Sequence, residues 1–156
     1  MTELIVIHGI SLPPGEYGGQ EIEALFTNTL DADAHPYFAE ISGLEVSAHF
    51  LVRRAGEVVQ FVSTDARAWH AGVSCWQGRE QCNDFSIGIE LEGCDDEAYS
   101  DAQYDALNQL LGALTKQYPD IRHDAIVGHS DIAPGRKTDP GPAFDWSRVV
   151  ASQSQQ

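Results

Sequence analysis

The chain has 156 residues, 42% of them hydrophobic and 21% charged, which is an ordinary composition for one soluble globular domain. Its formal net charge is −15, because 24 acidic residues outnumber 9 basic ones. Such an acidic chain is repelled by nucleic acid and by anionic membrane surfaces, so we expect neither as a partner.

Three features of the sequence predict a cytoplasmic protein. Its start, MTELIVIHG, has neither the basic region nor the cleavage site of a signal peptide, and no apolar run approaches the roughly 20 residues of a membrane-spanning helix. The cysteines Cys75, Cys82 and Cys94 form no C-x-x-C motif and are odd in number, which argues against a disulfide framework or a cysteine zinc knuckle. We therefore expect free thiols in a reducing compartment.

The N-terminal part of the chain begins with a predicted strand. Residues 4–8, LIVIH, are a short apolar run that ends in His8, which is typical of a buried strand that carries an ionisable group to the edge of a sheet. The proline- and glycine-rich residues 11–19 are predicted to form a loop. Residues 20–30 are predicted to form a helix, because their large apolar residues share one helical face, and residues 31–38 a second loop.

A β-hairpin is predicted for residues 46–62. Two runs rich in β-branched and aromatic residues flank residues 54–56, where a glycine allows a tight turn. The following residues, 64–84, show no clear period, and a loop of this length in a compact domain is usually functional or disordered. Because this segment contains Trp69 and His70, we expect a functional loop.

The next elements are a strand and a capped helix. Residues 85–93, FSIGIELEG, alternate large apolar residues with glycine and glutamate, as a strand does. Ser100 and Gln103 form a capping box that predicts a helix over residues 101–118.

The last elements complete the predicted architecture. Residues 125–129 are predicted to form a short strand, residues 144–150 a short helix, and residues 151–156 a polar tail. Residues 1–150 are therefore predicted to be one α/β domain, with a central mixed β-sheet flanked by helices.

The segment 128–141, GHSDIAPGRKTDPG, concentrates ionisable side chains in a loop rich in glycine and proline. Its His129 and Asp139, taken with His8, supply two imidazoles and a carboxylate, a common donor set of catalytic zinc sites that leaves a fourth position for water. Zinc would lower the pKa of that water toward ~7. The alternative is that both histidines are structural and that Asp139 caps a turn. Spacing alone favours this alternative, because the histidines lie far apart in the sequence.

Glu90 and Lys137 each have two interpretations. Glu90 lies between apolar strand residues, so it either faces solvent or points into a site beside the sheet, where a carboxylate near a metal-bound water acts as a general base. Lys137 stabilises an oxyanion if its loop folds inward, and is otherwise a solvated loop lysine.

The chain resembles one known family in several segments, in collinear order: VIHGISLPPGEYGG, HPYFAEI, VSAHFLVRRAGEVVQFV, RAWHAGVS, CNDFSIGIELEG, YSDAQY and GHSDIAPGRKTDPGPAFDW. These segments look like those of the AmpD-type N-acetylmuramoyl-L-alanine amidases. They belong to the type 2 amidase family, which also includes phage amidase lysozymes and peptidoglycan recognition proteins. The resemblance covers nearly the whole chain and implies the fold of that family.

The resemblance also implies roles for the chemical groups. His8, His129 and Asp139 match the zinc ligands of the family. Glu90 matches the base that acts on the zinc-bound water, and Lys137 matches the lysine that stabilises the transition state. One departure is Gly9, where family members usually have asparagine after the first histidine, so a side chain that orients the metal site is missing here.

Four further residues are implied to bind substrate. Trp69, His70 and Asn83 match groups that line the substrate cleft of the family. Family members often have a second arginine where this chain has Gln81, so we expect Arg79 to bind the carboxylates of the stem peptide.

The implied reaction is hydrolysis of the amide between N-acetylmuramic acid, in its 1,6-anhydro form, and L-alanine of the stem peptide, during peptidoglycan recycling. The implied partners are a muropeptide substrate and a zinc ion, bound by a monomeric cytoplasmic enzyme. Two alternatives remain: a non-catalytic muropeptide-binding module, and an exported cell-wall amidase whose signal precedes residue 1. The filled ligand set favours the enzyme over the binding module.

Overall fold

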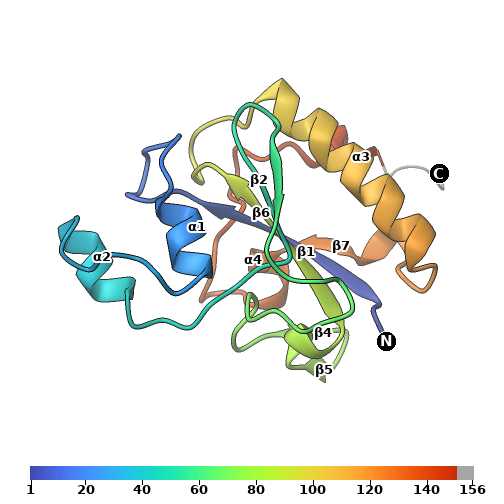
Figure 1. Cartoon of the computed structure of the whole chain (residues 1–156). Helices are drawn as coiled ribbons and strands as arrows, with labels where there is room; N and C mark the ends of the chain where they lie inside the picture. Colours follow the sequence, from blue (N-terminus) through green and yellow to red (C-terminus); the bar gives the residue numbers. More distant parts are fainter. Residues whose placement is uncertain (151–156) are drawn as a thin grey trace.

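A five-stranded sheet forms the centre of the computed structural model, which describes residues 1–150 (Figure 1). The strands lie in the order β3-β2-β6-β1-β7, with β1 at Leu4–Ile10, β2 at Phe50–Val52, β3 at Val58–Gln60, β6 at Ser86–Glu92 and β7 at Ile126–Gly128. Strand β1 pairs in parallel with β6 and β7, and β2 pairs in parallel with β6 and antiparallel with β3. This mixed sheet with its helices confirms the predicted fold class. Residues 151–156, the predicted polar tail, lie outside the described residues.

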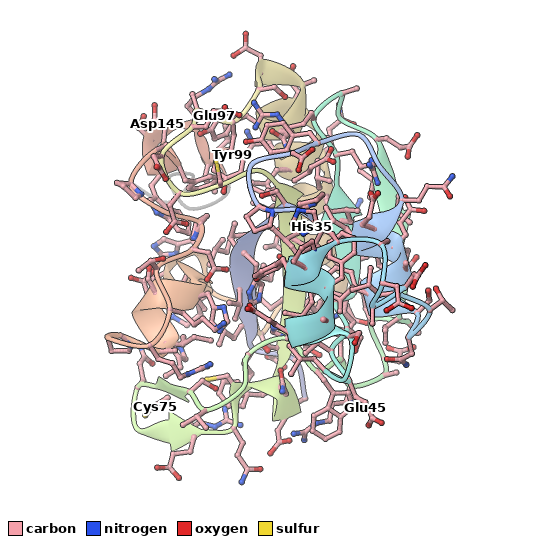
Figure 2. The ribbon with its side chains drawn as sticks, turned by 90° about the vertical axis from the view of Figure 1, so that its left-hand side faces the viewer. His35, Glu45, Cys75, Glu97, Tyr99 and Asp145 are labelled. Carbon is pink, nitrogen blue, oxygen red and sulfur yellow. The ribbon has the colours of Figure 1, made fainter. Side chains whose placement is uncertain are left out.

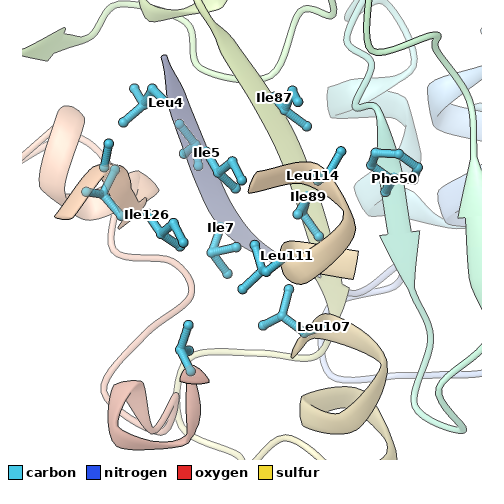
Figure 3. Packing of buried hydrophobic residues seen from close by; sticks show 14 of the residues in the cluster. Leu4, Ile5, Ile7, Phe50, Ile87, Ile89, Leu107, Leu111, Leu114 and Ile126 are labelled. Atoms are coloured by element: carbon cyan, nitrogen blue, oxygen red, sulfur yellow. The ribbon is translucent and has the colours of Figure 1, made fainter. Parts of the chain in front are cut away.

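One face of the sheet packs against helix α3, at Asp101–Gln117. Ile87, Ile89 and Leu91 of β6 belong to this core, and Figure 3 shows Leu107 and Leu111 of α3 beside the sheet residues. The helix begins at the predicted capping box, in which the Ser100 hydroxyl accepts a hydrogen bond from the Gln103 N–H and the Gln103 side chain accepts one from the Ser100 N–H. The alternation in β6 therefore places its large apolar side chains under α3.

The opposite face carries polar side chains from the central strands. Leu51 of β2, Glu90 of β6 and His8 of β1 are paired in register, so they lie side by side on this face. A second apolar cluster covers the Leu51 end, built with helix α1 at Glu21–Phe26 and helix α2 at Pro36–Ile41. His8 and Glu90 are not part of that apolar cluster and instead line a cavity.

Two predicted helices are shorter in the structure. Helix α1 ends at Phe26 instead of residue 30, because Asn28 adopts a left-handed φ of 60° that ends the helical path. The predicted helix over residues 144–150 is only a 3₁₀ turn at Trp146–Arg148. Across the described part of the chain, none of the helices combines the length and the apolar character that a bilayer crossing requires.

Two helices begin in segments that were predicted to be loops. Helix α2 begins at Pro36, a favourable residue in the first helical turn, and the His35 ring caps it by accepting a hydrogen bond from the Tyr37 N–H at 3.1 Å. A 3₁₀ turn at His123–Ala125 leads into β7, and the single-turn helix α4 follows at His129–Ile132. Helices this short contain too few residues for a recognisable hydrophobic period.

The predicted loop at residues 64–84 contains some regular structure. Strands β4 at Cys75–Trp76 and β5 at Arg79–Glu80 form a small separate hairpin, and a 3₁₀ turn follows at Cys82–Asp84. The hairpin turn has two residues with positive φ, Gln77 and Gly78, as a tight turn requires.

Gly112 gives a test of helix stability. It lies exposed in α3, and a Cβ added there would meet no atom within 4 Å. We expect Gly112→Ala to raise the free energy of unfolding by about 0.5–1 kcal/mol, because alanine loses less backbone entropy in a helix. Gly56→Ala is the opposing control, since Gly56 has a φ of 89° and its Cβ would lie 2.9 Å from the Ala102 carbonyl oxygen. Thermal unfolding should show a melting temperature that rises for the first variant and falls for the second.

Candidate active site

Three side chains from separate segments meet at the carboxyl ends of β1 and β7. His8 lies in β1, His129 directly follows β7, and Asp139 lies in the loop after α4. His8 Nδ1 is 3.0 Å from His129 Nδ1 and 3.4 Å from Asp139 Oδ2, and His129 Nδ1 is 3.2 Å from Asp139 Oδ1. The structure therefore brings together the three residues that were predicted as metal ligands.

The donor atoms of this set fit a divalent metal ion. His129 Nε2–H donates to the Ala71 carbonyl oxygen at 2.9 Å, so His129 Nδ1 presents a lone pair to His8 and Asp139. Donors on a tetrahedral zinc ion, with bonds of about 2.0–2.2 Å, lie about 3.3–3.5 Å apart. The observed separations of 3.0 to 3.4 Å are close to that spacing. Lone pairs that face one another at this distance are stabilised by a cation between them.

The ionisation of His8 and Asp139 also suits metal binding. Burial lowers the pKa of His8 to about 4, although the neighbouring Asp139 acts in the opposite direction. Burial alone would raise the pKa of Asp139, but its close interactions with His129 and His8 outweigh burial and hold that pKa below its usual range. At neutral pH His8 is therefore a neutral imidazole and Asp139 a carboxylate, the forms that bind a metal.

Glu90 lies next to the donor set with one oxygen free. Its Oε1 is 3.8 Å from His8 Nδ1, while Oε2 is buried and has no hydrogen-bond partner among the described residues. Burial, together with the nearby Asp139 carboxylate, raises the pKa of Glu90 well above its usual value. A buried carboxyl with a free oxygen is placed to exchange a proton with a molecule in the cavity.

A cavity of about 580 Å³ opens over these groups, within the usual range for small-molecule sites. His8, Glu90, His129 and Asp139 lie on its polar side. Its apolar side is lined by Leu12, Leu25, Phe26, Ile41, Leu44 and Trp69. Figure 2 shows helices α4 and α2 on opposite sides of β1, with His35 at the start of α2. The cavity can therefore hold a ligand that has both an apolar and a polar face.

Lys137 and Trp69 also line the cavity. The Trp69 side chain is 55% exposed, and the Arg67 guanidinium lies over its ring at 4.2 Å from the centroid. His70 lines the cavity too, but it is buried and both of its ring nitrogens contact protein groups. The structure thus places Lys137, Trp69 and His70 around one cavity, with Trp69 exposed and His70 buried.

The other two predicted substrate residues lie elsewhere. Asn83 is buried, and its Oδ1 accepts hydrogen bonds from the backbone N–H groups of His70 and Ala71, so it fixes the path of that loop. Arg79 pairs with Glu3 and lines a separate cavity of about 240 Å³. A role of Arg79 in substrate binding stays a prediction.

The space beside Gly9, where family members usually have a side chain, is filled by Tyr99, a residue that the sequence did not single out. A Cβ at Gly9 would lie 2.3 Å from the Tyr99 hydroxyl oxygen, so the buried Tyr99 fills the space where a side chain would stand. The Tyr99 hydroxyl donates to the carbonyl oxygen of Pro140, the residue after Asp139, and the Gly9 N–H donates to Asp139 Oδ2. Tyr99 and Gly9 therefore brace the Asp139 loop, and no local sequence signal connects them to it.

The fold and the site together point to the class of hydrolases, with a candidate metal site. The carboxyl ends of the parallel strands β1 and β7, with the loop after α4, present two imidazoles and a carboxylate. They lie beside a buried carboxyl with a free oxygen, in a cavity of small-molecule size. A family model described as N-acetylmuramoyl-L-alanine amidase matches residues 2–142. The chain belongs to the N-acetylmuramoyl-L-alanine amidase family, and the predicted family and enzyme class are confirmed.

Individual relatives agree with this assignment. The 1,6-anhydro-N-acetylmuramyl-L-alanine amidase AmpD of Enterobacter cloacae is 67% identical over 148 residues, which cover 95% of this chain and 79% of that protein. A crystal structure of a selenomethionine derivative of AmpD matches with a TM-score of 0.94 at 62% identity, covering 97% of this chain and 84% of that one. AmpDh3 from Pseudomonas aeruginosa, in complex with an anhydromuramic pentapeptide, matches with a TM-score of 0.76 at 31% identity, covering 97% of this chain and 60% of that one.

Proposed function

We propose that this chain hydrolyses the amide that joins 1,6-anhydro-N-acetylmuramic acid to L-alanine of a stem peptide, during peptidoglycan recycling. The observation that carries the proposal is the free Oε2 of Glu90, which lies beside the convergent donor set in the cavity. The substrate is supported by the name of the AmpD relatives and by the anhydromuramic pentapeptide in the AmpDh3 complex.

The proposed metal is zinc, held by His8 Nδ1, His129 Nδ1 and an Asp139 carboxylate oxygen. When bound, zinc would supply Lewis acidity, which lowers the pKa of a water molecule and polarises a carbonyl group. Neutral imidazoles and one carboxylate are the donor types that zinc prefers in catalytic sites.

The residues of the chain have distinct roles in the proposed reaction. Glu90 Oε2 takes a proton from the attacking water and returns it to the leaving amine of L-alanine. The Lys137 ammonium stabilises the negative charge that develops on the carbonyl oxygen. Trp69 and the apolar side of the cavity pack against the sugar and exclude water from it.

The proposal places the enzyme in the cytoplasm, acting as a monomer. The three cysteines are free thiols, and Cys75 is exposed, which suits a reducing compartment.

Mass spectrometry of the products tests the proposed function. The chain, with zinc, is incubated with a defined anhydromuropeptide, and the expected products are the free anhydro sugar and a peptide that begins with L-alanine. A chelator should stop the reaction and added zinc should restore it. Turnover that persists in the chelator would contradict the metal assignment, and binding without cleavage would favour a muropeptide-binding module.

Lys137→Ala is expected to lower kcat by about 10²-fold, because one stabilising group for the oxyanion is lost. Zinc affinity should stay unchanged, since Lys137 lies outside the donor set. Lys116→Ala, an exposed lysine of α3, is the matched control. Steady-state kinetics with zinc in excess measures both variants, and an unchanged kcat for Lys137→Ala would remove that residue from the mechanism.

Trp69→Ala is expected to raise KM about tenfold, equivalent to about 1.4 kcal/mol, because the sugar loses an apolar contact. Arg79→Ala is the comparison, because Arg79 lines the other cavity and an unchanged KM would mean that it does not reach the substrate. Both variants are measured with the same anhydromuropeptide. A raised KM for Arg79→Ala would instead support the stem-peptide role that the sequence predicted for it.

A further inference from the structure

A buried pair of residues, His70 and Ser86, lies directly behind the metal ligand His8. His70 Nδ1 is 2.9 Å from His8 Nε2, and His70 Nε2 is 3.0 Å from Ser86 Oγ. The His8 and His70 rings meet edge to face, with an interplanar angle of 89°. His70 is 8% exposed and Ser86 is 7% exposed. Both nitrogens of His70 therefore contact protein groups, and neither is left to bind a substrate.

The hydrogen positions in this chain follow from the ligand role of His8. If His8 Nδ1 gives its lone pair to the metal, the hydrogen of this neutral ring is on Nε2. His8 Nε2–H then donates to His70 Nδ1. The hydrogen of His70 must in turn be on Nε2, from which it donates to Ser86 Oγ. A histidine that ligates a metal usually donates its second N–H to a fixed acceptor in this way.

The surroundings hold the His70 ring in one place. Asn83 Oδ1 accepts from the His70 N–H and fixes the backbone on one side. On the other side lies Gly88 of β6, where a Cβ would be 2.4 Å from His70 Cγ. The ring occupies the space that the missing side chain of Gly88 leaves free, so the position of His70 depends on that glycine.

We propose that His70 is a positioning residue, which with Ser86 holds His8 in the tautomer and orientation that direct Nδ1 toward the metal. The inference rests on the proposed zinc site, and it differs from the substrate contact that the family resemblance implied for His70. It predicts that loss of His70 weakens metal binding first, and that activity falls as a consequence.

The main test is the dissociation constant for zinc, measured on the full chain by competition with a chromophoric chelator. His70→Phe keeps an aromatic ring of similar size but removes the acceptor for His8 Nε2–H, so zinc should bind about 10–100-fold more weakly. His70→Asn keeps an acceptor oxygen near the position of Nδ1 and should recover part of the affinity. Gly88→Ala leaves both histidines in the sequence but displaces the His70 ring, and should also weaken zinc binding.

His49→Phe is the matched control. His49 is also fully buried, and its ring lies 6.0 Å from that of His70, but its nitrogens contact the backbone N–H of Gly88 and the carbonyl oxygen of Ala66 instead of His8. We expect this variant to lose stability and to keep the affinity for zinc. A loss of affinity as large as that of His70→Phe would show that loosening of the fold is the cause, and would overturn the proposal.

Two further readouts separate positioning from a structural or substrate role. In the zinc-loaded protein, ¹⁵N NMR should place the His70 hydrogen on Nε2, and a hydrogen on Nδ1 would overturn the proposal. With zinc in large excess, His70→Asn should have the KM of the unaltered chain for the anhydromuropeptide. A raised KM under those conditions would instead assign His70 to substrate binding.

The outcomes also distinguish this inference from the proposed function. If the unaltered chain binds zinc and cleaves the muropeptide while His70→Phe binds zinc equally tightly, only the role of His70 is wrong. If the unaltered chain binds no zinc, both the proposed zinc site and the role of His70 are wrong. If His70→Phe does not fold, the NMR tautomer and the His70→Asn and Gly88→Ala affinities decide the question.

Discussion

Asp139→Ala is expected to abolish both zinc retention and amide hydrolysis. The change removes the only anionic member of the predicted donor set and leaves His8 and His129 without their shared carboxylate. Loss of a residue that only supports a ligand lowers metal affinity by up to about 100-fold. Loss of Asp139, a ligand itself, should therefore lower the affinity for zinc by more than that. Equilibrium dialysis with metal analysis measures retention, and product formation from the anhydromuropeptide measures hydrolysis.

Asp105→Ala is the control for this substitution, because Asp105 is exposed on α3 and is not among the residues that line the cavity. Circular dichroism of both variants shows whether the fold is kept. Full activity in a folded Asp139→Ala protein would mean that Asp139 is not a ligand and that the donor set is wrongly assigned.

Glu90→Gln is expected to keep zinc and lose most turnover. Glutamine preserves the shape of the side chain but cannot take up a proton, and the same carboxyl is proposed to serve both proton transfers. We expect kcat to fall by about 10³- to 10⁴-fold, at the upper end of the range for general base catalysis. Glu90→Ala should give a similar loss of turnover with zinc retained.

Zinc content and kcat are measured on the same samples, so that metal loss and loss of the base are told apart. Glu40→Gln, at an exposed position of α2, is the matched control. An unaffected rate in Glu90→Gln would remove Glu90 from the mechanism, even if Asp139 behaves as expected.

Much of the fold was predictable because its signals are local. The apolar run that ends in His8, the alternation of residues 85–93 and the capping box at Ser100 each act within a few residues, and the corresponding elements are present. Helices α2 and α4 were missed because each depends on a short-range cap or on tertiary packing rather than on periodicity. The end of α1 depends on the backbone conformation of Asn28, which the apolar pattern does not encode.

The site was predictable in part, and mainly through the family resemblance. Spacing alone favoured structural histidines, because nothing local shows that His8 and His129 meet across β1 and β7. The contact of His70 with Ser86 and the fit of Tyr99 beside Gly9 are tertiary contacts between distant segments, without a sequence signal of their own. Family resemblance gave His70 a role at the cleft, but its burial and its partners became visible only in three dimensions.

The two-sided character of β6 constrains how this enzyme can vary. Alternate residues of the strand serve different purposes: Ile87 and Ile89 belong to the apolar core with α3, whereas Gly88 and Glu90 belong to the cavity face. A single-residue insertion or deletion inside the strand would exchange the two sets, which would put a carboxylate under α3 and an isoleucine beside His8. Length changes in this family member should therefore be tolerated in its loops but not in β6, where one register error removes the core and the chemistry at once.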